Sequence, residues 1–321
     1  MARVLTLTLN PALDLSIRAG AIRLGEVNRT ESTRLDAGGK GINVARVLAG
    51  LGHDVTVSGL LGADNETAFV RTFAECGLRD AFVRVPGETR INAKLSEQDG
   101  RVTDLNGPGP RIPERSLEEL IERLWPLLPG LDAVVVSGSL PPNVAPEQFA
   151  GLITGIRERK VPVWLDTSGP ALVAGLAARP SGVKPNETEL AGWAGHSLDT
   201  PEERLRAALR LNTEGIDDVL LSVGAEGVIW AQRGSALMAR PPRVSVVSTV
   251  GAGDTLLAGS LHGVLSRWPR ERSLRFATAL AAESVRHVGV GDPNATDFEV
   301  LQQQTLVQEL SVKQLTRETH R

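Results

Sequence analysis

The sequence predicts one α/β domain whose central β-sheet is mostly parallel and is flanked by helices on both faces. Short apolar and β-branched runs alternate with helix-compatible segments along most of the chain, which is the pattern of consecutive βαβ units. The runs end in polar or glycine-rich loops, and the carboxyl ends of parallel strands meet at one edge of a sheet. With 321 residues, 41% of them hydrophobic, the chain can bury one large core. We therefore expect any ligand site at that edge.

The first strand is predicted at residues 4–9, an apolar run that ends before Asn10 and Pro11. Asp14 follows, and its carboxylate either faces a ligand crevice or stabilises a turn. Residues 12–35 are polar and contain short alternating pieces, which predict an antiparallel excursion from the main sheet.

A Gly-Gly-Lys-Gly sequence at residues 38–41 begins the first predicted helix, which continues to about Gly52. Lys40 and Asn43 lie in the first turn. A lysine is unfavourable there, because the helix dipole makes this end positive. An anionic or polyhydroxyl ligand would compensate for it; alternatively, Lys40 is simply solvated.

Residues 81–106 form a second polar, strand-like excursion. Because side chains alternate along a strand, Arg90, Asn92 and Lys94 project from one face, which is either solvated or binds an anion. We expect the excursions at 12–35 and 81–106 to pair as a small sheet that stands off the main domain.

The remaining pattern is regular α/β. Strands are predicted at 55–61 and beginning at residues 133, 161, 183 and 219, and helices at 65–76, 114–128, 146–159, 170–178 and 201–214. We expect residues 1–310 to form the single domain and residues 311–321 to be a disordered tail.

Residues 248–255, Ser-Thr-Val-Gly-Ala-Gly-Asp-Thr, are the most informative stretch. A β-branched run at 244–247 predicts a strand before it, and an apolar segment at 256–265 predicts a helix after it. The start of a helix has free N–H groups and a positive dipole, and glycine lets an anion approach closely. Asp254 lies beside this anion socket, as a functional carboxylate or as a helix cap.

Composition excludes several classes of function. The net charge of −3 and the absence of a basic stripe give no support for nucleic acid binding. Cys76 is the only cysteine, which excludes an internal disulfide and Cys-rich metal sites and favours a reducing cytoplasm. The position of Cys76 in a predicted helix favours the interpretation that it is a small, buried hydrophobic residue. The N-terminus lacks a signal-peptide pattern, and no long apolar run predicts a membrane span.

These motifs together resemble a known family. Residues 37–62 and 166–189, with Gly-Ala-Gly-Asp at 251–254, are similar to the signatures of the phosphofructokinase-B branch of the ribokinase-like sugar kinases. Residues 6–12, 87–94 and 137–141 are most similar to the enzymes of this family that phosphorylate fructose 1-phosphate. The resemblance extends from residue 1 to about residue 300. It implies a ribokinase-like fold, in which the excursions at 12–35 and 81–106 form a β-sheet lid, and transfer of phosphate from ATP to the 6-hydroxyl of fructose 1-phosphate. The lid of this family often pairs between two subunits, and an exposed sheet edge is unfavourable, which favours a homodimer through the lid.

The resemblance also implies roles for individual residues. Asp254 would be the general base, and Gly251, Ala252 and Gly253 the anion hole. The groups that would bind the sugar and its phosphate are Asp14, Gly38, Gly39, Lys40, Asn43, Arg90, Asn92, Lys94 and Ser139, with Arg29 and Arg101 as weaker candidates. The groups that would bind the nucleotide are Lys184, Asn186, Glu189, Ser222, Gly224, Ala225, Glu226, Gly227, Ser248 and Thr249.

The implied cofactors are ATP and Mg²⁺, the latter ordered by Asn186 and Glu189 mostly through water. A monovalent cation such as K⁺ would bind carbonyl groups near residues 250–252 and 286–291.

Five alternatives remain. Kinases of tagatose 6-phosphate or fructose 6-phosphate share most of these signatures. A catalytically silent sugar-phosphate sensor is disfavoured by the intact Gly-Ala-Gly-Asp, and a nucleoside kinase by the cations at the sugar end. A dehydrogenase is disfavoured because no Gly-x-Gly-x-x-Gly follows the first strand.

Overall fold

The computed structural model describes residues 1–311, and its main feature is a large β-sheet. The strands of this sheet are β1 (Arg3–Thr8), β4 (Asp54–Gly62), β5 (Arg79–Val85), β8 (Ala133–Ser137), β9 (Val163–Asp166), β10 (Gly182–Val183), β11 (Asp218–Ser222), β12 (Val228–Gln232), β13 (Ser235–Arg240) and β14 (Leu306–Leu310). Within the described residues their order is β14-β13-β12-β11-β10-β9-β8-β1-β4-β5. The seven strands from β11 to β5 are parallel, as predicted.

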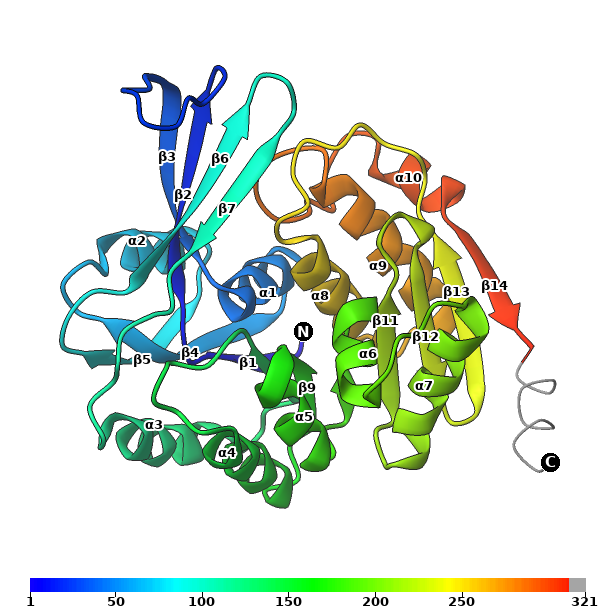
Figure 1. Cartoon of the computed structure of the whole chain (residues 1–321). Helices are drawn as coiled ribbons and strands as arrows, with labels where there is room; N and C mark the ends of the chain where they lie inside the picture. The colour runs from blue at the N-terminus through cyan, green and yellow to red at the C-terminus, as the bar shows by residue number, and fades with distance from the viewer. Residues whose placement is uncertain (312–321) are drawn as a thin grey trace.

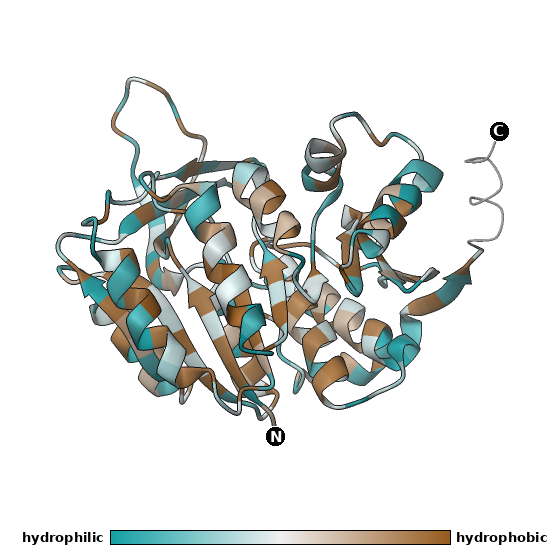
Figure 2. Ribbon diagram, turned by 90° about the horizontal axis from the view of Figure 1, so that it is seen from below, coloured by the Kyte–Doolittle hydropathy of each residue, from teal (hydrophilic) through white to brown (hydrophobic). Residues whose placement is uncertain are grey.

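Helices cover both faces of the sheet (Figures 1 and 2). They are α1 (Lys40–Gly50), α2 (Thr67–Glu75), α3 (Ser116–Leu124), α4 (Pro146–Glu158), α5 (Gly169–Ala177), α6 (Glu187–Ala194), α7 (Pro201–Thr213), α8 (Ala252–Leu265), α9 (Arg270–Ser284) and α10 (Phe298–Gln304). Short 3₁₀ turns lie at Trp125–Leu127 and Gly224–Glu226. The cores of the two faces contain different helices: α3, α4, α5 and α7 pack on one side, and α1, α2, α8, α9 and α10 on the other.

Strand β8 shows why the central strands are continuously apolar. Val134 and Val136 point into the core beneath α3 and α4, whereas Ala133 and Val135 point into the core beneath α1 and α8. Successive side chains of a strand face opposite sides, so a parallel strand between two helix layers must be apolar at every position.

The lid is a separate sheet that stands off the main body (Figure 1). Its strands are β2 (Ala12–Ala19), β3 (Thr30–Gly38), β6 (Arg90–Glu97) and β7 (Val102–Asn106), in the order β3-β2-β6-β7. One predicted boundary is wrong: residues 81–85 belong to β5, an edge strand of the large sheet. These residues alternate in polarity because β5 pairs with β4 on one side only, while Phe82, Val83 and Val85 enter the core.

The carboxy-terminal edge of the large sheet differs from the prediction. Strands β12, β13 and β14 add to β11 in antiparallel fashion, and the sequence analysis did not identify them. The strand expected at residues 244–247 is also wrong, because this segment is an irregular loop with Val246 and Val247 each 62% exposed. Its β-branched residues have no strand to pair with, since β13 already lies between β12 and β14.

The segment beginning at Val183 is shorter than a usual strand. β10 ends at Val183, the chain turns at Lys184 and Pro185, and α6 begins at Glu187. Proline has no N–H for a strand ladder, which favours this early end.

No helix in residues 1–311 is both long and apolar enough to cross a membrane. Of the predicted tail, residues 312–321 lie outside the described residues.

Candidate active site

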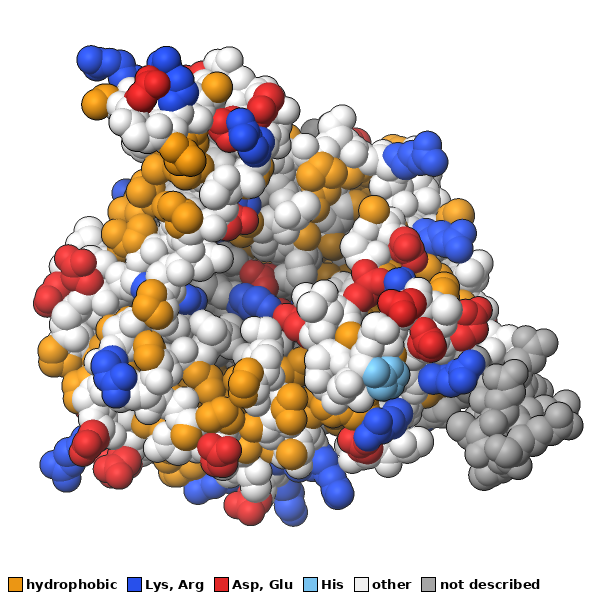
Figure 3. All heavy atoms as spheres, in the orientation of Figure 1, with side chains coloured by type: hydrophobic (Ala, Val, Ile, Leu, Met, Phe, Trp, Pro, Cys, Tyr) orange, Lys and Arg blue, Asp and Glu red, His pale blue; other side chains and the backbone are white. Residues whose placement is uncertain are grey.

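The predicted site residues come from the carboxyl ends of β8, β10 and β11 and the loops that follow them, from the starts of α1, α6 and α8, and from the lid. Figure 3 shows a hollow between the lid and the main body, with acidic and basic side chains in it. This is the edge at which the sequence predicts ligand binding.

The glycine turn before α8 leaves the start of this helix open. Gly251 is the N-cap with φ of 81°, a left-handed conformation that glycine adopts readily, and it provides no side-chain cap. Within residues 1–311, the N–H groups of Gly253 and Asp254 donate no hydrogen bond to another group of the protein. Two free donors at the positive end of a 14-residue helix make a suitable anion socket.

Asp254 lies in the first turn of α8 with 6% of its surface exposed. Its Oδ2 accepts a hydrogen bond of 2.8 Å from Nδ2 of Asn43, in the first turn of α1. Burial, and then the charge of Asp166, raise the pKa of Asp254 to about 6, although Lys40, Asn43 and Lys184 act in the opposite direction. A carboxyl group with a pKa near neutrality is suited to general-base chemistry.

Asp166 is a member of this site that was not predicted from the sequence. Its side chain is fully buried, and Nζ of Lys40 lies 2.9 Å from Oδ1 while Nζ of Lys184 lies 3.4 Å from Oδ2. Burial alone would raise the pKa of Asp166, but Lys184 and Lys40 bring it below its ordinary value. The available signal was its position directly after the predicted strand at 161–165.

The two lysines lie close to the other site groups. A Cβ atom added to Gly253 would be 3.2 Å from Nζ of Lys184, so this ammonium group lies against the first turn of α8. The pKa of Lys40 is raised because Asp166 and Asp254 outweigh its burial.

The lid contributes a polar face to the site. Alternation along β2 and β6 places Asp14, Arg90, Asn92 and Lys94 on the same face, as predicted for the last three. Oδ1 of Asp14 accepts a hydrogen bond of 3.1 Å from Nδ2 of Asn92, and burial raises the pKa of Asp14. Lys94 lies 3.7 Å from Asp104.

Two glycines let the start of α1 approach the lid. A side chain at Gly38 would collide with the carboxylate of Asp14. Gly39, the N-cap of α1, has φ of 119°. Asp14 therefore lies directly beside the start of α1.

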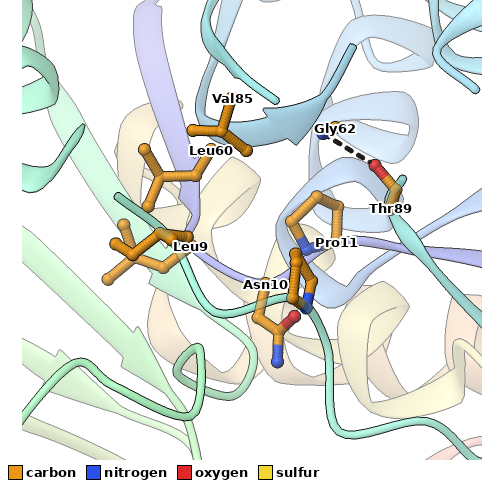
Figure 4. Close-up of a pocket in the computed structure, with 9 residues that line it drawn as sticks. Leu9, Asn10, Pro11, Leu60, Gly62, Val85 and Thr89 are labelled. Atoms are coloured by element: carbon orange, nitrogen blue, oxygen red, sulfur yellow. Dashed lines mark hydrogen bonds between the residues drawn. The ribbon is translucent and has the colours of Figure 1, made fainter. Parts of the chain in front are cut away.

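Arg90 connects the lid to the main body. Its guanidinium group donates to the carbonyl oxygens of Asn10, Pro11 and Gly107 and to Oγ of Ser139. Figure 4 shows the neighbouring pocket at the lid base, where the Gly62 N–H donates to Oγ1 of Thr89. The structure therefore brings Arg90 and Ser139 together, with four of the five arginine N–H donors engaged within the protein.

On the nucleotide side, Asn186 and Glu189 form a capping box at the start of α6. Oδ1 of Asn186 accepts from the Glu189 N–H, and Oε2 of Glu189 accepts from the Asn186 N–H, both at 2.8 Å. The charge of Glu189 contributes to the raised pKa of Lys40. A carboxylate with one oxygen outside the box suits Mg²⁺, which keeps several waters and needs few protein ligands. In the described part of the chain, no cluster of three His, Cys, Asp or Glu side chains is arranged for a metal.

The other predicted nucleotide residues lie on neighbouring loops. Oγ of Ser222 lies 3.4 Å from the carbonyl oxygen of Pro185, and the 3₁₀ turn Gly224–Glu226, which includes Ala225, follows. Gly227 is required sterically, because a side chain there would collide with the Ala239 carbonyl.

Three of these residues have local or exposed positions. Glu226 lies 3.5 Å from Arg204. Ser248 accepts a hydrogen bond from the Val250 N–H, and Thr249 is exposed on the loop before α8.

Comparison with known proteins points to one family. The model of the pfkB family of carbohydrate kinases matches residues 7–297. The 1-phosphofructokinase of Vibrio cholerae is 45% identical over 308 residues, covering 96% of this chain and 97% of the relative. The 1-phosphofructokinase of Escherichia coli is 47% identical over 289 residues, covering 90% and 93%. The structure of phosphofructokinase-2 from Escherichia coli in complex with fructose-6-phosphate has a TM-score of 0.85 and 27% identity, covering 94% of this chain and 99% of that chain. The chain belongs to the pfkB family of carbohydrate kinases.

Proposed function

We propose that the protein transfers the γ-phosphoryl group of ATP to the 6-hydroxyl of fructose 1-phosphate and forms fructose 1,6-bisphosphate. Relatives named 1-phosphofructokinase, 45% and 47% identical over 90% or more of this chain, support the choice of substrate. The observation that carries the chemistry is the buried carboxylate of Asp254 beside the free N–H groups that begin α8.

In the proposed mechanism, Asp254 accepts the proton of the sugar hydroxyl as this oxygen attacks phosphorus. Gly251, Ala252 and Gly253 surround the site of the transferred group, and the N–H groups of Gly253 and Asp254 donate to it. Lys40 and Lys184 place positive charge beside the same site, which stabilises the charge on the phosphoryl oxygens.

The remaining predicted residues hold the two substrates. Asp14, Gly38, Gly39, Asn43 and Asn92 would contact the sugar, and Arg90, Lys94 and Ser139 its phosphate. Ser222, Gly224, Ala225, Glu226, Gly227, Ser248 and Thr249 would line the nucleotide site. Mg²⁺, ordered through water by Asn186 and Glu189, would neutralise charge on the triphosphate.

The lid supports the proposal of a homodimer. Its face away from the site carries Leu35, Ile91 and Leu105, which are 41%, 46% and 57% exposed in one chain. Pairing two lids would cover this apolar face. One solved relative is described as a tetrameric form of phosphofructokinase-2 from Escherichia coli, so larger assemblies occur in the family.

A monovalent cation near residues 250–252 is also proposed. Gly251 lies close to Gly289, whose carbonyl oxygen would be 3.0 Å from an added Cβ atom, so the two predicted carbonyl segments adjoin. Phosphofructokinase-2 from Escherichia coli has been solved in complex with potassium. The single cysteine is consistent with action in a reducing cytoplasm.

A second candidate is phosphorylation of fructose 6-phosphate, since the phosphofructokinase-2 structure with that sugar shares the fold. Tagatose 6-phosphate is a third substrate to test. ADP release with Mg-ATP should be measured for all three sugars. We expect the highest kcat/KM with fructose 1-phosphate and loss of turnover in Asp254→Asn. Equal or faster turnover of another sugar would reject the substrate, and an active Asp254→Asn would reject the mechanism.

A further inference from the structure

Two buried or half-buried lysines at this site occupy electrostatically unfavourable positions. Lys40 lies in the first turn of α1, and Lys184 lies against the first turn of α8. The starts of both helices are positive, so each helix repels the nearby ammonium group, and the two cations also repel one another. Lys184 is 4% exposed, so solvent contributes little to its stabilisation.

Asp166 is the group that compensates for these charges. Each of its oxygens faces one lysine, Nζ of Lys40 at 2.9 Å and Nζ of Lys184 at 3.4 Å. A buried carboxylate is costly unless it is paired, and a fully buried one between two cations from different elements is paired on both sides. No backbone N–H of the described residues donates a hydrogen bond to its carboxylate, so the polar contacts of this group are those with the two lysines.

We propose that Asp166 is a positioning residue, which holds Lys40 and Lys184 together at the start of α8 where the phosphoryl group would be transferred. This inference rests on the proposed kinase mechanism. Asp166 does not itself contact the reacting atoms; it fixes the cations that do. The arrangement allows two positive charges to remain at a helix start before an anionic substrate arrives.

A role in stability alone would leave the pH profile in place, whereas an ionised Asp166 that holds the cations inside the site also acts on the titration of Asp254. The groups that face Asp254 are Asn43 and Lys40 from α1, Asp166 from the end of β9, and Lys184 after β10. The neighbouring helix α9 meets α8 at Gly259 through the apolar Ala277. Removing the charge of Asp166 removes its repulsion of the Asp254 carboxylate, which lowers the pKa of Asp254.

The test is the pH dependence of kcat/KM for Asp166→Asn, with Asp218→Asn as the control. Asp218 is also a buried aspartate, but it accepts hydrogen bonds from Trp230 and Gln232 at the far end of β11. For Asp166→Asn we expect kcat to fall about 100-fold. We also expect the acidic limb of the profile to move to lower pH by on the order of one unit. Asp218→Asn should leave the limb in place. An unmoved limb in Asp166→Asn would overturn the proposal.

A second variant covers the case in which Asp166→Asn does not fold, since it leaves Lys184 buried without its partner. The double variant Asp166→Asn with Lys184→Met removes both charges. Asp166 affects Asp254 more strongly than Lys184 does, so the limb should still move to lower pH. An unmoved limb or a shift to higher pH would contradict the proposal. If the limb does not move to lower pH but Asp254→Asn is inactive, the role of Asp166 is rejected while the proposed kinase mechanism stands.

Discussion

At the scale of single residues, the pKa of Asp254 decides how the proposed base behaves. Burial and the charge of Asp166 raise this pKa from 3.8 to about 6, while the hydrogen bond from Asn43 limits the rise. The pKa of an exposed aspartate lies far below physiological pH, whereas the pKa of Asp254 lies only about one unit below it. A higher pKa makes the carboxylate a stronger base, at the cost of its ionised fraction in mild acid.

This predicts an acidic limb with an apparent pKa of about 6 in the profile of kcat/KM against pH. Protonation of Asp254 removes the base, so activity should fall as the pH drops through this value. The measurement is steady-state ADP release with the sugar phosphate below its KM. A profile that stays flat down to pH 4.5 would show that Asp254 is not the titrating group or not the base.

Glu189 has both a structural and a proposed functional contact, which a substitution can separate. In Glu189→Gln, the side-chain oxygen can still accept from the Asn186 N–H, so the capping box is kept and stability should change by less than about 0.5 kcal/mol. The lost charge should raise the Mg²⁺ concentration needed for half-maximal activity about tenfold.

A matched control for this prediction exists in α7, where Thr200 and Glu203 form the same kind of capping box. Glu203→Gln should leave the Mg²⁺ requirement unchanged. If both variants behave alike in a Mg²⁺ titration, Glu189 is a helix cap and has no part in binding the metal.

At the scale of elements, the start of α8 combines stability with an open anion site. A capping side chain satisfies one of the first N–H groups in α6 and in α7, but the N-cap of α8 is Gly251 and provides none. The helix is instead held by its apolar surface, with Leu256, Leu257 and Leu261 buried. Packing along its length allows its first turn to remain free for a ligand.

Alanine substitutions at two helical glycines should separate the stability of a helix from the function of the open start of α8. In Gly253→Ala, the added methyl would lie 3.2 Å from Nζ of Lys184 and within the proposed phosphoryl site, so kcat should fall about 100-fold while the protein still folds. In Gly192→Ala, on α6, the methyl meets nothing within 4 Å. That variant should gain about 0.5–1 kcal/mol and keep full activity. Thermal unfolding and ADP release measure both; wild-type activity in Gly253→Ala would contradict the placement of the phosphoryl group.

At the scale of the whole molecule, a histidine pair links the start of β1 and the start of β4 to α8. Nε2 of His53 and Nδ1 of His262 are 2.9 Å apart, and the Ala2 N–H donates to Nδ1 of His53. Burial, His53 and Arg272 lower the pKa of His262 to about 4. Asp132 is the acidic group that acts in the opposite direction on His53, whose pKa is also lowered.

The pair predicts a loss of stability in acid. Because the pKa of His262 in the folded state is below its unfolded value of 6.5, its contribution is complete above pH 6.5 and is lost as the pH falls toward 4. Replacing the histidine by an uncharged residue, as in His262→Gln, should flatten the dependence of Tm on pH in this window. Asp254, with its raised pKa, has the opposite slope, so the comparison is between the variant and the wild type. Parallel curves for the two proteins would contradict the prediction.

The predictions from sequence succeeded where the chemistry is local. Alternating apolar runs and helices predicted the parallel strands, and the glycine turn at 251–253 predicted an open helix start. The shared face of Arg90, Asn92 and Lys94 follows from the geometry of one strand, and the register of β6 with β2 confirms it.

The sequence by itself determined the fold class, the lid and the family of carbohydrate kinases, because these depend on patterns along the chain. Only the tertiary structure placed residues 81–85 in the large sheet, left residues 244–247 without a partner strand, and brought Asp166 between Lys40 and Lys184. A β-branched run can pair with any free edge, and a buried carboxylate is stable only beside cations that lie far away in sequence. Such choices depend on which edges and charges meet when the chain folds, and spacing along the chain does not specify them.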